Sequence, residues 1–157
     1  MNSVVAEATG VGEFQLRIDT GEHSFIMDEP LELGGLGTGP NPFDMMCAAI
    51  AACTLMTMRL YATHKGWTIG QLRVRVAHSK GKRGARDRFD RTLDLGEVTA
   101  EQREGLVRIA RRCPVHLLLE RGAELTDSVA ESPLLAAVAD TDHAADIEEL
   151  CKAADLA

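Results

Sequence analysis

Cysteines are the residues of this sequence best suited to chemistry. The chain has four of them, at Cys47, Cys53, Cys113 and Cys151, and no two have the C-x-x-C spacing of a redox or zinc motif. The first ten residues, MNSVVAEATG, contain neither a basic segment nor an apolar run, so we expect a cytoplasmic protein. Permanent disulfides are rare in that compartment. Redox chemistry, metal binding and plain packing therefore remain as roles for the thiols.

Cys53 lies in the middle of a long apolar stretch. Asn41 suits an N-cap, Pro42 the first helical position and Gly66 a C-cap, which predicts a helix from residue 42 to about residue 65. Hardly any polar face is left along it, and a helix that is apolar all round must be buried all round. One sheet in a domain of this size covers only one side of such a helix. We therefore expect the other side to pack against a second copy of the chain.

Cys113 is placed at the end of a second predicted helix. Thr99 and Gln102 have the spacing of a capping box, and Pro114 prevents continuation of the helix. Apolar residues follow at helical steps along one stripe: Leu106, Ile109, Ala110 and Cys113. Cys113 is therefore expected to end this helix on its core face.

Strands and one further helix complete the predicted elements. Period-two alternation of apolar and polar residues predicts strands in residues 13–19, 24–28, 72–76, 89–95 and 124–129. After Pro133 a short amphipathic helix is expected to carry Ile147, Leu150, Cys151 and Ala154 on one side. This mixture of helices and antiparallel strands indicates an α+β fold.

Length and charge limit the classes of partner. The chain has 157 residues with 45% hydrophobic and 26% charged residues, which is typical of a folded domain with its own core. Its net charge of −7 repels nucleic acid and anionic membranes. No continuous apolar run approaches the roughly 18 residues of a membrane span. We expect neither nucleic acid nor a membrane as partner.

Two segments resemble the OsmC/Ohr family of osmotically inducible and organic hydroperoxide resistance proteins. They are GPNPFDMMCAAIAACTLMTMRLYATHKGW and AEQREGLVRIARRCPVHLLL. The shared features are a glycine-rich loop, an Asn-Pro helix start, an Ala-Ala-Cys inside a long helix and a Cys-Pro after a second helix. The resemblance covers roughly residues 4–127. It predicts a family domain at residues 1–130 and a C-terminal helical extension at residues 131–157.

The resemblance implies a fold and an activity. The fold is an intertwined homodimer in which long central apolar helices are wrapped by antiparallel sheets from both subunits. The activity is reduction of small hydrophobic peroxides, with Cys53 as the peroxidatic thiol and Cys113 as the resolving thiol. Oxidation gives a sulfenic acid and then a disulfide. No cofactor is expected, but an external thiol or dithiol reductant is needed to close the cycle.

The chain departs from the family at the groups that activate the peroxidatic thiol. More familiar members have an arginine near the amino-terminal strands and a glutamate ten positions before this cysteine, where this sequence has Phe43. The nearest carboxylate, Asp44, falls on the opposite face of a regular helix. Arg17 is the only arginine in the amino-terminal strands. His116 could hydrogen-bond near the thiols. Arg17, Asp44 and His116 are thus the possible activating residues.

The remaining predictions concern the substrate and the competing functions. Residues that share a helix face with Cys53 are expected to line the site for the apolar tail of the peroxide: Met46, Ile50, Met56 and Leu60. A C-x-x-H spacing from Cys113 to His116 could supply half of a zinc site, but we expect no metal. The competing hypothesis is a binding module of the same fold, redox-sensitive or with an apolar pocket, that has lost fast turnover.

Overall fold

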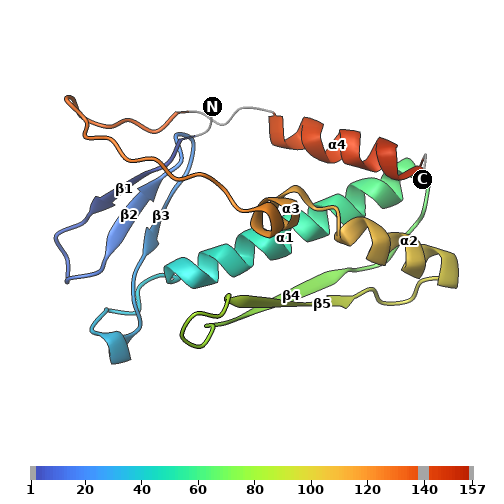
Figure 1. The fold of residues 1–157 in the computed structure, drawn as a ribbon, viewed down its shortest axis with the longest axis horizontal. Helices are drawn as coiled ribbons and strands as arrows, with labels where there is room; N and C mark the ends of the chain where they lie inside the picture. Colours follow the sequence, from blue (N-terminus) through green and yellow to red (C-terminus); the bar gives the residue numbers. More distant parts are fainter. Residues whose placement is uncertain (1–2, 138–141, 156–157) are drawn as a thin grey trace. The chain divides into compact units, whose positions relative to one another are not determined.

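The computed structural model describes residues 3–137 and 142–155, and it has a mixed α+β fold. In these residues the strands are β1 (Val5–Ala8), β2 (Leu16–Asp19), β3 (Ser24–Met27), β4 (Arg73–Ser79) and β5 (Arg88–Asp94). The α-helices are α1 (Pro42–His64), α2 (Ala100–Ala110), α3 (Pro114–Arg121) and α4 (Asp142–Asp155). The chain forms two compact units, Met1–Met45 with Leu125–Thr141, and Met46–Glu124 with Asp142–Ala157 (Figure 1). The predicted α+β fold with a long central helix is confirmed.

The first unit contains the antiparallel sheet β1-β2-β3. Ile18 of β2 stands opposite Ala6 of β1 and Phe25 of β3, and it is the strand residue that this sheet buries most fully. The predicted strand at residues 13–19 is shorter than expected: β2 begins at Leu16, and Phe14, which precedes it, is exposed. β1 was not predicted, since its sequence lacks an alternating apolar pattern.

A buried carboxylate organises the glycine-rich loop after β3. Asp28 accepts hydrogen bonds from Leu36 N at 3.1 Å, Thr38 N at 3.2 Å and Thr38 Oγ1 at 2.8 Å. The loop backbone passes so close to its neighbours that a Cβ at Gly35 would lie 1.8 Å from Glu29 O. Glycine is therefore needed at this position for the close approach of two backbones.

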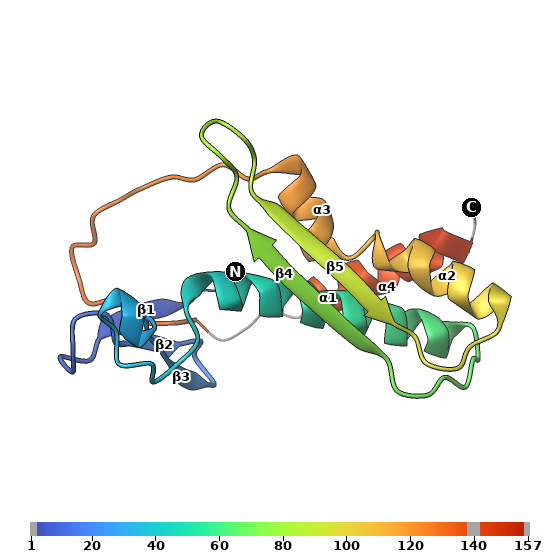
Figure 2. The same cartoon turned by 90° about the horizontal axis from the view of Figure 1, so that it is seen from below.

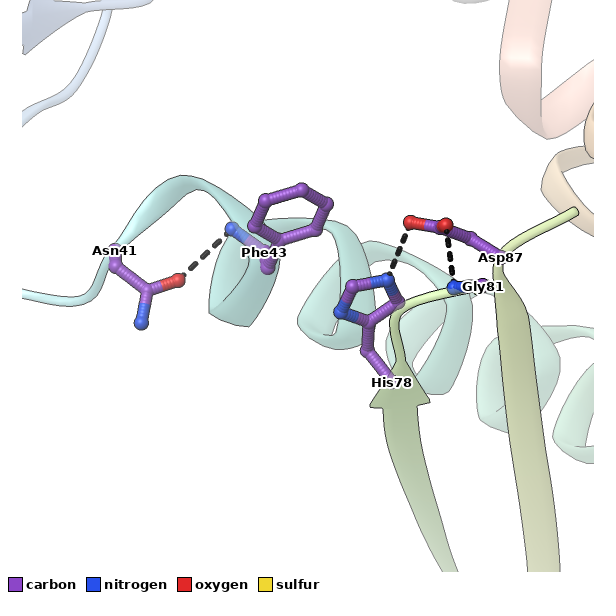
Figure 3. Close-up of polar contacts among 5 residues, drawn as sticks. All are labelled: Asn41, Phe43, His78, Gly81 and Asp87. Atoms are coloured by element: carbon purple, nitrogen blue, oxygen red, sulfur yellow. Dashed lines mark hydrogen bonds and ion pairs between the residues drawn. The ribbon is translucent and has the colours of Figure 1, made fainter. Parts of the chain in front are cut away.

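The long helix α1 begins and ends as the sequence predicts. The Asn41 side chain accepts from Phe43 N at 2.9 Å (Figure 3), and the carboxylate of Asp44 accepts from Asn41 N at 3.3 Å. Gly66 takes a positive φ of 65° just after the last turn. By its length and composition α1 is long and apolar enough to cross a membrane. The core helix of a soluble protein meets the same criterion.

The second unit is built around the greater part of α1. Both views place α1 between the β4-β5 hairpin and α4 (Figures 1 and 2). The buried core of this unit consists of Met58, Tyr61, Ala62, Leu72, Leu95, Leu106, Ile109, Ala110, Ile147 and Cys151. Each large apolar side chain buried in this way contributes about 1.5–3 kcal/mol to folding. The core therefore holds α1 firmly against α2, the hairpin and α4.

A polar loop, residues 80–87, joins the two strands of the hairpin. β4 and β5 pair in register from Arg73 opposite Asp94 to Ser79 opposite Arg88. Beyond the strand ends the carboxylate of Asp87 accepts from Gly81 N at 2.9 Å and lies 2.7 Å from His78 Nε2 (Figure 3). These contacts lower the pKa of Asp87. The predicted hairpin is confirmed.

The segment around Cys113 differs from the prediction. The capping box of Thr99 and Gln102 is present, but α2 ends at Ala110, three residues before Cys113. Cys113 is instead the N-cap residue of α3, with Pro114 at the first helical position. A proline that stops one helix is well suited to start another, because its missing N–H would be unpaired there in any case. Cys113 thus lies at a helix start.

The carboxyl-terminal region is only partly as predicted. No strand forms at residues 124–129, where Leu125 is 92% and Val129 95% exposed. An alternating pattern specifies a strand only where a partner strand is available, and none pairs with this segment in the described residues. The predicted terminal helix is confirmed as α4, with Ile147 and Cys151 buried. The side chain of Ala154 lies outside the described residues. The division at residue 130 stays a prediction.

Candidate active site

The two cysteines singled out by the sequence meet inside the second unit. Their Sγ atoms are 2.8 Å apart, although 60 positions separate the residues. Cys53 comes from the middle of α1 and Cys113 from the junction between α2 and α3. Both are free thiols, with exposed fractions of 3% for Cys53 and 0% for Cys113. The site is therefore a buried dithiol.

The start of α3 makes the environment of Cys113 electropositive. The backbone amides of Val115 and His116, in the first turn of this helix, lower the pKa of the Cys113 thiol. The Cys113 side chain forms no cap hydrogen bond in the strict sense, so these amides act mainly as oriented dipoles. The Thr54 hydroxyl, fully buried on α1, lowers the same pKa. The surroundings thus favour a thiolate at Cys113.

The contact between the two sulfurs moves the pKa values of the two thiols apart. The Cys53 thiol is the main cause that lowers the pKa of Cys113, to about 6, while burial opposes this change. The same contact with Cys113, followed by burial, raises the pKa of Cys53. The hydroxyl of Thr57 lowers it, although Thr57 Oγ1 also donates to the backbone oxygen of Cys53 at 2.8 Å. At neutral pH the pair therefore holds a single proton, with the negative charge mainly on Cys113.

An arginine missed by the sequence predictions reaches this site from β5. Arg91 Nη1 donates to Thr54 Oγ1 at 2.9 Å and to the backbone oxygen of Ala110 at 2.8 Å. Burial lowers the pKa of the Arg91 guanidinium, and Cys113 and Cys53 oppose that change. An arginine stays protonated in proteins. The dithiol is therefore accompanied by a partly buried cation.

A family profile for OsmC-like proteins matches residues 35–126, which include both cysteines. The chain belongs to the OsmC-like protein family. A comparison with curated protein sequences gave no match.

Solved structures of this family have the same fold. An OsmC-like protein from Mycoplasma pneumoniae shares 21% identity and superposes with a TM-score of 0.61 over 76% of this chain and 87% of that one. The organic hydroperoxide resistance protein OsmC from Legionella pneumophila shares 20% identity, with a TM-score of 0.58 over 76% and 88%. The organic hydroperoxide resistance protein OhrB of Bacillus subtilis shares 23%, with a TM-score of 0.53 over 74% and 88%.

The three possible activating residues of this family member lie in different surroundings. Arg17 belongs to the first unit, where it is exposed and lies 3.8 Å from Asp19. Asp44, in the same unit, serves the cap of α1. His116 lies beside the dithiol, but its ring pairs with Glu120 at 3.1 Å, and its backbone amide is the group that acts on Cys113. Of these three, only His116 is placed with the thiols in the second unit.

The four predicted lining residues do not share one environment. Ile50 is buried like Cys53, Leu60 is partly buried against the core, and Met46 and Met56 are exposed. A separate groove of about 600 Å³ lies between α3 and α4 and begins at Pro114 and Val115. Its lining residues are Pro114, Val115, Leu117, Leu118, Arg121, Asp146, Glu149, Leu150 and Ala153.

Metal ligation needs more donors than this site offers. In the part of the chain that the structure describes, no three His, Cys, Asp or Glu side chains gather as a metal site requires. Cys113 and His116 have the spacing of two zinc ligands, but the His116 ring is engaged with Glu120. The chemistry that this arrangement supports is that of two thiols with a shared proton.

Proposed function

We propose that this OsmC-like protein is a thiol peroxidase that reduces organic hydroperoxides through Cys53 and Cys113. The observation that supports this most is the 2.8 Å separation of two thiols in a site that stabilises one negative charge. A thiolate is the form of cysteine that attacks a peroxide, and a free cysteine near its ordinary pKa is only a few per cent ionised at neutral pH. The site supplies the charged form without a cofactor.

The reaction balances with the single proton that the pair holds. The Cys53 thiolate attacks the terminal oxygen of the hydroperoxide, the O–O bond breaks, and Cys53 becomes a sulfenic acid. The alkoxide that leaves takes the proton of the Cys113 thiol and departs as an alcohol. The Cys113 thiolate then attacks the sulfenic sulfur, an S–S bond forms, and hydroxide leaves. An external thiol or dithiol then reduces the disulfide.

We assign the attack to Cys53 for reasons of access. Cys53 retains an exposed fraction of 3%, whereas Cys113 retains none. One turn after Cys53 on α1, Met56 is 56% exposed, so the peroxide approaches Cys53 from the open side of the helix. The resting charge lies mainly on Cys113. Transfer of the proton from Cys53 to Cys113, across 2.8 Å, therefore precedes the attack.

The apolar surroundings favour a hydrophobic peroxide. Ile50 is buried on the Cys53 side of α1, and Met46 and Met56 offer exposed apolar surface along the same helix. The groove between α3 and α4 adds apolar surface next to the residues that follow Cys113, although neither cysteine lines it. An alkyl or acyl tail that covers these side chains would exclude water from the leaving alkoxide.

We propose further that the protein works as a homodimer in the cytoplasm. The most apolar part of α1 is only 39% buried within one chain. Exposed apolar side chains along α1 include Phe43, Met46 and Met56. Monomeric proteins rarely leave a large continuous apolar patch in water. A second copy of the chain would cover part of this face, and the part beside Met56 would remain as the approach to Cys53.

A second candidate function follows from the burial of the thiols. With exposed fractions of 3% and 0%, the pair could react so slowly that the protein serves as a redox-sensitive or apolar-ligand binding module. The rate of thiol loss after a stoichiometric dose of cumene hydroperoxide separates the two functions. Loss of two thiols per chain within seconds supports the peroxidase. Loss as slow as that of free cysteine supports the binding module.

Single substitutions test the roles of the two thiols. Cys53→Ser should abolish peroxide consumption, because the attacking sulfur is lost. Cys113→Ser should allow one turnover that stops at a Cys53 sulfenic acid, which dimedone traps. Cys47→Ser serves as the control and should keep full activity. A sulfenic acid trapped on Cys113 in the Cys53→Ser variant, at the wild-type rate, would show that the roles are reversed.

A further inference from the structure

We propose that Arg91 is the residue that activates the dithiol, and that it acts on Cys113 through the hydroxyl of Thr54. The proposal rests on the proposed function for its biological purpose, since it names the group that keeps the pair charged. Arg91 belongs to the same unit as the two cysteines, whereas Arg17 belongs to the first unit. Arg91 is a positioning residue, because another side chain lies between it and the sulfur.

The register of β5 directs Arg91 to the interior. Along this strand Phe89, Arg91 and Leu93 are partly buried, while the residues between them are exposed. The arginine therefore occupies an apolar position of the alternating pattern. Burial of a cation in such a position costs several kcal/mol unless an opposite charge compensates it. The position of Arg91, partly buried, thus favours a counter-charge nearby.

The dithiol is the counter-charge that the surroundings offer. In the described residues, no carboxylate lies within ion-pair distance of the Arg91 guanidinium. The charged groups around it are Cys113, Arg111, Cys53 and Glu120, and Cys113 acts on it most strongly. Arg111 repels it, and Glu120 attracts it more weakly. The backbone oxygen of Ala110, at the end of α2, supplies a partial negative charge.

Thr54 connects the cation to the sulfur. Its hydroxyl can accept two hydrogen bonds but can donate only one. Arg91 Nη1 donates to Thr54 Oγ1 at 2.9 Å, which leaves the hydroxyl proton free to point to Cys113. A donor that is itself polarised by a cation gives a stronger hydrogen bond in a buried site. The chain Arg91, Thr54, Cys113 therefore stabilises a thiolate more than the threonine would alone.

The test measures the ionisation of the thiols without any peroxide. The reduced protein is alkylated with iodoacetamide over a range of pH, and mass spectrometry follows Cys53 and Cys113 separately. In Arg91→Met, which keeps an apolar stem but removes the charge, the apparent pKa of Cys113 should rise by about 1 or more. Alkylation below that pKa should then be about 10-fold slower. Arg91→Lys should restore part of the effect.

Matched variants distinguish activation from a structural role. Arg88→Met, on the same strand but with a solvent-exposed side chain, should leave the profile unchanged. Thr54→Val should raise the apparent pKa of Cys113 while Arg91 remains, and it keeps the test decisive if Arg91→Met does not fold. An unchanged profile in folded Arg91→Met or in Thr54→Val overturns the proposal. Because no turnover is measured, a failed peroxidase assay would refute only the proposed function.

Discussion

The dithiol makes the stability of the reduced protein depend on pH in a way that removal of Cys113 should abolish. In the folded protein the pKa of Cys113 is lowered from 9.0 to about 6, and that of Cys53 is raised above 9.0. In the unfolded chain both thiols titrate near their ordinary value. Between pH 6 and 9 the folded state therefore binds one proton fewer than the unfolded state. Stability contributed by the pair should rise with pH in this window.

The size of the effect follows from linkage. Each pH unit adds about 1.4 kcal/mol when folding releases one proton, so the rise across the window amounts to about 4 kcal/mol. Above pH 9 the sign reverses, because the unfolded chain loses both protons while the folded protein retains the one on Cys53. Below pH 6 both states hold two protons and the contribution vanishes. The pair should thus stabilise the protein most near pH 9. A typical domain has 5–15 kcal/mol in total, so the change is measurable.

Urea unfolding under reducing conditions tests this prediction. The free energy of unfolding is measured at several values between pH 6 and 9 for the wild type and for Cys113→Ala, at one protein concentration. The difference between the two proteins isolates the thiol pair from other titrating groups. The free energy of unfolding of the wild type should exceed that of Cys113→Ala by an amount that grows with pH. Cys53→Ala, which also breaks the pair, should show no such growth relative to Cys113→Ala. Parallel pH profiles for wild type and Cys113→Ala would refute the assignment of a shared proton.

Three further predictions concern assembly, oxidation and the glycine-rich loop. Sedimentation at micromolar concentration should show a dimer, because α1 leaves apolar surface open; a stable 17 kDa monomer would contradict it. Mild oxidation should join Cys53 to Cys113 within one chain, as peptide mapping would reveal, and a bridge to either other cysteine would exclude this pairing. Gly35→Ala should destabilise by about 1–3 kcal/mol in thermal or urea unfolding, because its Cβ would overlap Glu29 O. The control Gly70→Ala, with nothing within 4 Å, should change stability by about 0.5 kcal/mol or less; equal losses would remove the argument from close packing.

Much of the fold could be predicted because local signals decide it. Asn41 and Gly66 fix the two ends of α1, and the capping box at Thr99 fixes the start of α2. The predictions were wrong where a sequence pattern forms its element only against another segment of the chain. Residues 124–129 alternate as a strand would, yet nothing in the described residues pairs with them. Pro114 predicts the end of a helix at Cys113, whereas α2 ends at Ala110 and Pro114 begins α3, so Cys113 lies at a helix start.

The meeting of the two cysteines followed from the family motifs, whereas the source of the positive charge did not. The family resemblance predicts an arginine in the amino-terminal strands, and Arg17, the arginine there, is exposed in the first unit. The sequence pattern that indicates an inward-facing arginine is in β5. Phe89 and Leu93 mark the inward phase of that strand, and Arg91 falls in the same phase. A charged residue at an apolar position of an alternating strand indicates a buried partner, even when the partner is distant in sequence.

The loss of the family glutamate at position 43 is compatible with activity if a single proton serves the whole site. An arginine with a nearby glutamate is oriented by that carboxylate, but its net effect on a thiol is partly cancelled. Arg91 is oriented by neutral acceptors instead, the Thr54 hydroxyl and the Ala110 carbonyl. Its charge is therefore available to the dithiol, and in the proposed reaction the shared proton, once it has moved from Cys53 to Cys113, is the one that the leaving alkoxide takes. The substitution Thr54→Glu would bring a carboxylate against the guanidinium. It should lower the rate at which the two thiols are alkylated. Arg59→Glu, which places the same carboxylate at a solvent-exposed position of α1, should leave that rate unchanged.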